Sequence, residues 1–366
     1  MNAVLDLPTP CLLLDLDVLE QNLAAMQAKA DRLGVALRPH AKTPKCLEVA
    51  RLQGELGARG LTVSTLAEAR FFAAGGFDDL TWAFPVQLDR LAEVRELAER
   101  VTLRLVVDSE AAVDALDGFA HPFHLLLKVD CGYGRCGVDP ASAEGHALAR
   151  RLADHPRLRF DGLLSHSGDA YAAADRAGAA AVAERERATI TAFAERLRGD
   201  GVEVETVSVG STPAMTAVED LAGVTEARPG NYAFFDGTQA AIGSCTPADC
   251  ALTLLASVVS CRPGADHAVT DAGALALSKD PGPTHLGERW RWGMGALMPE
   301  SGAKLLDAHL TALSQEHGKT SRPLPVGSRV RVLPNHSCLA VPNFDAYHLV
   351  RGGEVVGRWA IFQGRP

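Results

Sequence analysis

The chain has 366 residues, which is more than one small hydrophobic core requires, and its composition of 47% hydrophobic and 22% charged residues is ordinary for a globular enzyme. A net charge of -9, with no basic run of five or more residues, argues against a nucleic-acid surface and favours a small ligand. No apolar run approaches the roughly 18 residues of a membrane span, and residues 1–8 do not resemble a signal peptide, so we expect a cytoplasmic protein. Eight cysteines without regular spacing fit a reducing compartment better than a disulfide framework.

Strand-like and helix-like segments alternate over the first two thirds of the chain. Short apolar runs predict strands at 11–15, 35–37, 61–63, 80–84, 102–107, 123–129, 160–165 and 204–209. Segments with helical periodicity follow at 17–32, 44–56, 66–74, 88–99, 109–116, 140–153 and 173–198, and another helix follows the last strand. About eight strand–helix units predict an α/β fold with a parallel sheet and favour a closed, TIM-like (β/α)8 barrel over an open sheet.

The pattern changes near residue 251. Beyond it, β-rich segments separated by glycine and proline turns occur at 252–259, 267–270, 330–333, 348–350 and 355–362. We therefore expect two domains: a barrel over residues 1–245 and a mostly β domain over residues 246–366.

Lys42 is the first candidate for chemistry. It lies in the run Arg38-Pro39-His40-Ala41-Lys42, between a predicted strand and a predicted helix. The carboxyl ends of barrel strands are where such folds place their active sites. A lysine there is a candidate amine nucleophile, although an ordinary loop lysine would look the same in the sequence.

Two later strands end in similar loops. The first, residues 128–137, has three glycines in six residues, which would let the backbone pass close to a flat ligand, and carries Arg135 as a permanent cation. The second carries His166 just past a buried strand. Both loops would lie at the same rim as Lys42, so either residue could be part of the site.

Two successive loops resemble a phosphate-binding site. Gly210-Ser211-Thr212 follows a strand and precedes a helix, and so presents N–H and O–H donors to an anion. Gly230-Asn231-Tyr232 adds a second glycine turn with a phenol, one strand later. The loops after the late strands of a barrel often bind phosphate groups.

The last candidate is a pair of residues that could bind one metal ion. In His336-Ser337-Cys338 an extended backbone would place the imidazole and the thiol on one side. This pair favours zinc over magnesium or calcium, and two protein ligands leave positions for water or substrate, as in a catalytic site. Asp345 and His348 are candidate partners of these ligands, whereas the roles of Asp236 and Asp271 are open.

Taken together, these motifs resemble the D-serine dehydratase/D-threonine aldolase family, which are pyridoxal-phosphate enzymes of the alanine-racemase fold type. The resemblance runs nearly end to end and rests on several motifs in order. They are Thr9-Pro10, 38–43, 130–137, 165–168, 210–213, 228–232 and 334–338.

The resemblance implies a role for each residue. Lys42 would bond covalently to pyridoxal 5'-phosphate, Arg135 would face its pyridine nitrogen, and His166 and Tyr171 would lie by its ring. The phosphate would be held by Ser211, Thr212, Gly230, Asn231 and Tyr232. A divalent metal on His336 and Cys338, zinc rather than manganese or magnesium, would polarise the β-hydroxyl of a D-amino acid.

The resemblance leaves two outcomes open. If Lys42 takes the α-proton and the hydroxyl leaves, the products are a 2-oxo acid and ammonia, as in a D-serine dehydratase. If a base such as His166 or metal hydroxide deprotonates the hydroxyl instead, retro-aldol cleavage gives glycine and an aldehyde. The His-x-Cys pair resembles the dehydratase branch, since the aldolases compared carry a carboxylate in place of the cysteine.

Two other classes also stay open: a pyridoxal-phosphate-binding protein without turnover, and an amino-acid racemase, which would need a second base and no metal. The family also implies a homodimer.

Overall fold

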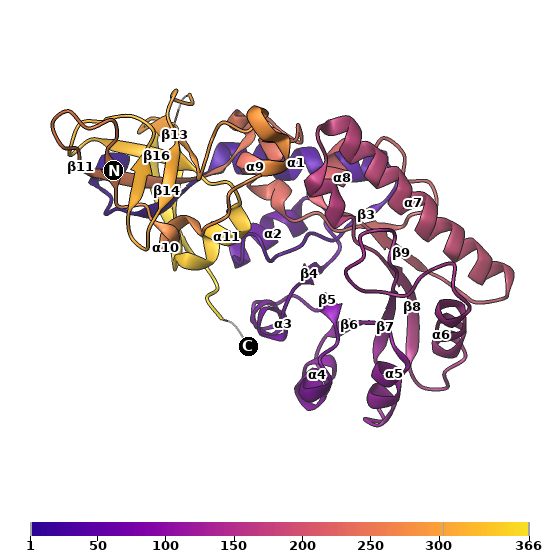
Figure 1. The fold of residues 1–366 in the computed structure, drawn as a ribbon. Coiled ribbons are helices and arrows are strands. Elements are labelled where there is room, and N and C mark those ends of the chain that lie inside the picture. Colours follow the sequence, from indigo (N-terminus) through magenta and orange to yellow (C-terminus); the bar gives the residue numbers. More distant parts are fainter. Residues whose placement is uncertain (1, 303, 365–366) are drawn as a thin grey trace.

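The computed structural model describes residues 2–302 and 304–364 and contains two sheets. One is a parallel sheet surrounded by helices, and the other is a mostly antiparallel sheet built from both ends of the chain (Figure 1).

The parallel sheet has eight strands in the order β3-β10-β9-β8-β7-β6-β5-β4. Their bounds are β3 Ala36–Leu37, β4 Leu61–Val63, β5 Asp79–Pro85, β6 Thr102–Val107, β7 His124–Lys128, β8 Arg159–Leu164, β9 Thr206–Val209 and β10 Glu226–Ala227. The first and last strands in this order, β3 and β4, meet just beyond β3, where His40 and Thr62 form a parallel bridge. The N–H of Ala41 donates to the carbonyl of Thr62, and the N–H of Thr62 donates to that of Pro39, both at 2.8 Å. The sheet therefore closes on itself, which confirms the predicted barrel.

Helices of the first two thirds of the chain surround this barrel (Figure 1). They are α1 Leu16–Arg32, α2 Leu47–Glu55, α3 Leu66–Ala74, α4 Leu91–Ala98, α5 Glu110–Asp117, α6 Ala143–Ala153, α7 Arg176–Gly199, α8 Thr212–Ala217 and α9 Gly237–Ala241. Helix α1 shows why they form: Asp15 caps its first turn by accepting from Asp17 and Val18. Its apolar side chains recur at helical spacing and are buried, as Leu19 and Leu23 illustrate. None of the helices in the described ranges combines the length and the apolar composition that crossing a membrane requires.

Part of the barrel interior is ionic rather than apolar. Arg38, at the end of β3, is buried and binds Glu226 Oε2 through Nε at 2.6 Å and Asp79 Oδ1 through Nη1 at 2.8 Å. Ser208 donates to the same glutamate at 2.6 Å. Because buried charges need partners, this network fixes the inner faces of β3, β5, β9 and β10 relative to one another.

The second sheet contains ten strands. Their bounds are β1 Asn2–Ala3, β2 Cys11–Asp15, β11 Leu252–Ser260, β12 Val269–Thr270, β13 Ala296–Pro299, β14 Leu310–Leu313, β15 Gly318–Thr320, β16 Arg329–Leu333, β17 Ala346–Arg351 and β18 Glu354–Ala360. Two short helices, α10 Ala274–Leu277 and α11 Ser337–Ala340, lie in the same part of the chain.

One predicted strand belongs to this sheet instead of the barrel. Residues 11–15 do form a strand, β2, but it pairs antiparallel with β11 and parallel with β17. The barrel's eighth strand is β10, which the sequence reading did not count among its eight units. Alternation with α1 predicts a strand at this position but cannot show which sheet it joins. We keep a domain division near residue 245 as a proposal, with β1 and β2 added to the second unit.

Candidate active site

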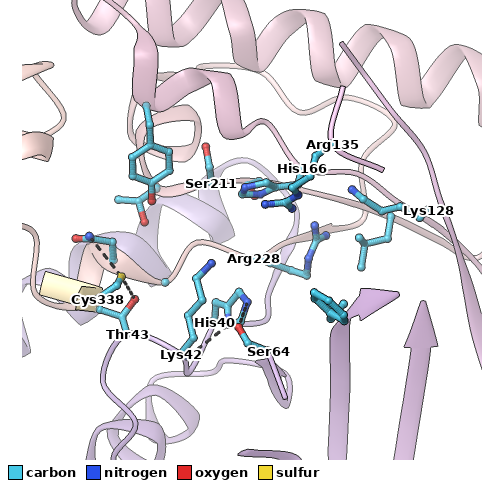
Figure 2. Close-up of a pocket in the computed structure, with 18 of the residues that line it drawn as sticks. His40, Lys42, Thr43, Ser64, Lys128, Arg135, His166, Ser211, Arg228 and Cys338 are labelled. Atoms are coloured by element: carbon cyan, nitrogen blue, oxygen red, sulfur yellow. Dashed lines mark hydrogen bonds between the residues drawn. The ribbon is translucent and has the colours of Figure 1, made fainter. Parts of the chain in front are cut away.

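A cavity of about 350 Å³ lies beyond the carboxyl ends of the barrel strands, where the residues expected from four separate loops meet (Figure 2). The predicted site residues that line it are Lys42, Arg135, His166, Tyr171, Ser211, Thr212, Gly230, Asn231 and Cys338. It shares Lys42, His166, Tyr171 and Cys338 with a more open cavity of about 1000 Å³, which His336 lines. The barrel rim and the second sheet therefore contribute to one site.

Lys42 lies in the turn that follows β3, and Figure 2 shows its ammonium pointing into the space between Cys338 on one side and His166 and Arg135 on the other. The second domain supports this turn. The hydroxyl of Tyr347 donates to the carbonyl of Pro44 at 2.6 Å, and the N–H of Phe362 donates to that of Lys45 at 2.7 Å. The position of Lys42 thus depends on both parts of the chain.

The smaller cavity is strongly cationic. Lys42, Lys128, Arg135 and Arg228 line it, and none of the described residues around it is an aspartate or a glutamate. Lys128, at the end of β7, is buried, and burial together with the nearby Arg228 lowers its pKa to about 8. A cavity of this kind favours an anionic occupant, because a negative charge relieves the repulsion between the cations.

His166 is held neutral in this environment. Burial, and then the positive charges of Lys42, Arg135 and Lys128, hold the pKa of its imidazole well below its usual range. Its Nδ1 lies 3.1 Å from the carbonyl oxygen of Gly210, so Nδ1 carries the hydrogen and donates. The opposite nitrogen is left as a weakly basic acceptor.

The two predicted phosphate loops face the same cavity. The backbone N–H groups of Ser211, Thr212, Gly230 and Asn231 have no acceptor among the described residues. Gly210 has φ +122°, a conformation that favours glycine, and this turn brings the loop to the cavity. Unpaired N–H groups next to hydroxyls form a suitable cradle for a phosphate.

Tyr232 is the exception among the predicted phosphate ligands. Its side chain is buried, its hydroxyl accepts a hydrogen bond from Gln53 at 2.9 Å, and it does not line the cavity. Only its backbone reaches the loop, by donating to Thr212 Oγ1 at 3.1 Å. The phenol therefore anchors the loop in the core under α2, which spacing in the sequence could not show.

These features fit the implied pyridoxal phosphate: a lysine amine, a set of unpaired N–H groups, excess positive charge and a volume of about 350 Å³ occur in one cavity. Arg135 lies at its rim, where its guanidinium stacks on the ring of Tyr133 at 5.2 Å. An arginine donates hydrogen bonds but does not give up its proton at ordinary pH, so it is suited to facing an unprotonated ring nitrogen.

His336 and Cys338 lie together, but not for the expected reason. His336 has extended backbone angles, but Ser337 begins the short helix α11, so the three residues do not form one extended segment. Burial lowers the pKa of His336, but the Cys338 thiolate and Asp280 outweigh burial and raise it to about 11. Burial raises the thiol pKa of Cys338, but His336, Lys42 and Thr43 together lower it below its ordinary value. An imidazole beside a thiolate is a donor set that suits zinc.

Asp280 orients the histidine. Its Oδ2 lies 3.2 Å from His336 Nδ1, which leaves Nε2 for a metal. The candidates Asp345 and His348 have no contact with His336 among the described interactions; Asp345 pairs instead with Arg358 at 3.0 Å. Nowhere in residues 2–302 and 304–364 do three His, Cys, Asp or Glu side chains converge as a metal cluster. The pair would therefore need water or substrate to complete a metal's coordination.

Sequence reasoning missed several residues of the site. Lys128 and Arg228 line the cavity and lie at or just after strand ends, so the rule that found Lys42 could have found them as well. Thr43, whose hydroxyl lies 3.0 Å from the Cys338 sulfur, and Asp280, which contacts His336, carry no comparable signal, because each acts on a residue distant in the sequence.

Comparisons with known proteins agree with this geometry. The family model "Alanine racemase, N-terminal domain" matches residues 14–237, and the model "Putative serine dehydratase domain" matches residues 251–350. The solved structure of an alanine racemase from Clostridium difficile, 12% identical, superposes with a TM-score of 0.70 and shows the fold alone.

Characterised relatives match over nearly the whole chain. A D-threo-3-hydroxyaspartate dehydratase from Delftia sp. (strain HT23) is 36% identical over 99% of both chains, and its solved structure superposes with a TM-score of 0.94 over 100% of both. A D-serine dehydratase from Dictyostelium discoideum is 32% identical, covering 94% of each chain. A D-threonine aldolase from Arthrobacter sp. is 33% identical, covering 96% of this chain and 92% of its own.

The fold and the site thus define an alanine-racemase-like protein, a barrel followed by a mostly β domain. Within that class, the chain belongs to the D-serine dehydratase/D-threonine aldolase family of pyridoxal-phosphate-dependent lyases.

Proposed function

We propose that this protein is a pyridoxal-phosphate- and divalent-metal-dependent lyase that dehydrates D-β-hydroxy amino acids, in the manner of a D-serine dehydratase. The observation that carries the proposal is the pairing of His336 with a cysteine, Cys338, at the edge of the cavity that Lys42 enters. This pair would hold zinc, with manganese or magnesium less suited to a thiolate.

The bound groups would supply two kinds of chemistry. Pyridoxal phosphate withdraws electrons from the α-carbon of a bound amino acid, and the metal is a Lewis acid for the β-hydroxyl. The cofactor would be held by Lys42, by the cradle of Ser211, Thr212, Gly230 and Asn231, and by Arg135 at the rim. The metal would be held by His336 and Cys338, with Asp280 fixing the imidazole.

The remaining steps belong to the protein. Once released from the cofactor, the Lys42 amine would accept the α-proton. Arg135, always charged, would discourage protonation of the ring nitrogen and so limit how long a carbanion can persist. The overall reaction removes the α-proton and the β-hydroxyl as water, and hydrolysis then gives a 2-oxo acid and ammonia.

The electrostatics of His166 argue against this residue as the base for retro-aldol cleavage, which leaves metal hydroxide as the base that cleavage would use. Cleavage needs a base for the β-hydroxyl, and a histidine whose pKa is held well below its usual range is a poor base. The solved structure of a cysteine-to-alanine variant of a D-threo-3-hydroxyaspartate dehydratase is of a metal-free form, which is consistent with a cysteine acting as a metal ligand in that enzyme.

We also propose a homodimer. Phe84, 51% exposed, and Leu339, 44% exposed, are large apolar side chains at the mouths of the two cavities, and a second subunit would cover them. Light scattering coupled to gel filtration would show a single monomeric mass if this is wrong.

One assay tests the function. The purified protein, loaded with cofactor, is incubated with D-serine, D-threonine or D-3-hydroxyaspartate in the presence of zinc or manganese, and 2-oxo acid, ammonia and glycine are all measured. Dehydration predicts 2-oxo acid and ammonia in equal amounts. Glycine as the product would instead establish the aldolase reaction, and full activity after chelation would refute the metal's role.

A further inference from the structure

The side chain of Asn231 has a conformation that phosphate binding does not explain. It lines the smaller cavity and is only 1% exposed. Its Nδ2 donates to Asp236 Oδ2 at 2.5 Å and lies 3.8 Å from the sulfur of Cys338. Its Oδ1 is buried and has no hydrogen-bond partner among the described residues.

Asp236 fixes the direction of this amide. The carboxylate is buried, and it also accepts hydrogen bonds from the N–H groups of Gln239, at 2.9 Å, and Ser337, at 3.0 Å. Burial raises the pKa of this carboxyl, whereas His336 and the three N–H donors lower it. Since all three N–H groups point at its oxygens, the carboxyl acts as an acceptor toward Asn231. A flipped Asn231 would place its own oxygen against that carboxylate, so the observed orientation is enforced.

The same aspartate ties the two halves of the site together. On the barrel side, Asp236 caps the N-terminus of α9. On the other side, it accepts a hydrogen bond from the N–H of Ser337, which lies between His336 and Cys338 in the chain. The N–H groups of Gly237 and Thr238 continue the junction by donating to Pro334 and Asn335 at 2.9 and 3.1 Å. The Asn231 amide is therefore held at the end of the cavity where Cys338 lies.

An unpaired, buried oxygen needs a donor. A phosphate cannot supply one in its dianionic form, since two acceptors repel, so Asn231 can contribute its backbone N–H to the cradle but not this oxygen. The hydroxyl of Thr43 is already directed at the Cys338 sulfur, at 3.0 Å. The missing donor is therefore expected to come from a ligand that reaches the Cys338 end of the cavity.

We propose that Asn231 Oδ1 accepts a hydrogen bond from the β-hydroxyl of the bound amino acid, and that Asp236 is the positioning residue that points it there. This inference rests on the proposed function, because that function places a β-hydroxyl at the end of the cavity where Cys338 lies. Under this proposal, Asn231 and Asp236 together make the protein select β-hydroxy D-amino acids over D-amino acids without a β-substituent. A buried acceptor left without its donor disfavours a ligand by roughly 10- to 100-fold.

The test compares two ligands in the zinc-loaded holoenzyme. D-Serine carries the hydroxyl and is followed by kcat and KM, whereas D-alanine lacks it and is followed by its inhibition constant. In Asn231→Leu, kcat/KM for D-serine should fall about 10- to 100-fold, while inhibition by D-alanine is unchanged or stronger. The absorbance of the bound cofactor and the zinc content should stay those of the unsubstituted protein.

Asp236→Asn is the second variant, and it keeps the shape while removing the constraint on the amide. It should move selectivity in the same direction by a smaller factor, mainly through KM. Asn22→Leu is the matched control, since Asn22 is also a buried asparagine but bonds the carbonyls of Ala233 and Asp249, at 3.2 and 2.8 Å. This control should leave the ratio between the two ligands unchanged.

Several results would overturn the inference. Equal losses for D-serine and D-alanine in Asn231→Leu would mean a general structural role, loss of cofactor would mean a phosphate ligand, and loss of zinc would mean a metal ligand. Unchanged selectivity in an active protein refutes the inference alone. If the unsubstituted protein turns over none of the three β-hydroxy amino acids, the proposed function itself has failed.

Discussion

The two halves of the site are built in different ways. On the barrel side, every residue lies at or shortly after the end of a parallel strand: Lys42 after β3, Lys128 at the end of β7, His166 after β8 and Arg228 after β10. On the other side, His336 and Cys338 follow one strand of an antiparallel sheet, and their partner Asp280 lies 56 residues earlier.

This difference teaches why one half could be located from the sequence and the other only in part. Parallel strands bring all their carboxyl ends to one edge, so the position of a residue in its strand–helix unit is enough to place it. Antiparallel strands alternate in direction, so contacts at their ends depend on the tertiary fold. The predictions below separate the two halves.

Lys42→Ala should have the largest effect, because it removes the amine that bonds to the cofactor and accepts the α-proton. We expect kcat/KM to fall by at least about 10³-fold and the absorbance of the lysine-bound cofactor to disappear. Lys45→Ala is the control from the same loop, since Lys45 pairs with Glu68 instead of lining the smaller cavity, and it should keep that absorbance. A band that persists in Lys42→Ala would mean that another amine binds the cofactor.

Cys338→Ala should disable only the second half. We expect bound zinc to be lost and activity to fall about 10²- to 10³-fold, while the cofactor absorbance is retained, because the barrel loops that hold the cofactor are intact. Cys261→Ala is the control, since the thiol of Cys261 faces the carbonyl of His267 at 3.6 Å, and this variant should change neither the bound zinc nor the activity. Metal analysis and turnover that are both normal in Cys338→Ala would contradict the assignment.

Lys128→Met tests the cationic cavity by stability in protein prepared without cofactor. The pKa of Lys128 is lowered from 10.5 to about 8, so between those pH values the unfolded chain holds a proton that the folded protein has lost. Folding is therefore favoured as the pH rises through this window, and below pH 8 the full cost of burying the charge remains. Urea unfolding should show Lys128→Met more stable than the unsubstituted protein at pH 8, by up to about 3 kcal/mol.

That stability difference should shrink as the pH approaches 10.5, because the lysine becomes neutral in both states. A difference that does not vary with pH would mean that Lys128 is not buried as a destabilising cation.

Asp280→Asn should have the smallest effect. It removes the carboxylate that orients His336 but leaves both metal ligands, so we expect zinc affinity to fall about 10- to 100-fold and activity to recover at high zinc concentration. Asp345→Asn is the paired control. The sequence made Asp345 a candidate partner of His336, whereas the structure pairs it with Arg358. The zinc affinity of the Asp345→Asn protein should therefore equal that of the unsubstituted protein. Equal effects in both variants would argue against an orienting role for Asp280.

Sequence reasoning performed well where structure is local. The barrel, the mostly β second part, Lys42 and the loops carrying Arg135, His166 and Ser211 were all predictable from periodicity and from position after strands. It did less well where contacts are long-range. Residues 11–15 form a strand as predicted, but its partners are β11 and β17, more than 230 residues away in the chain. Tyr232 has the right position for a phosphate ligand, yet its phenol bonds Gln53.

By itself, the sequence determined the elements and the residue types available for chemistry, because hydrophobic periodicity and chain order dictate which segments form strands and helices. The tertiary structure decided which of those residues meet. The pairing of β3 with β10 in the barrel, the support of the Lys42 turn by Tyr347 and Phe362, and the orientation of His336 by Asp280 all involve contacts between segments distant in sequence. No local pattern encodes such contacts, since they arise only when both surfaces are folded and buried against each other.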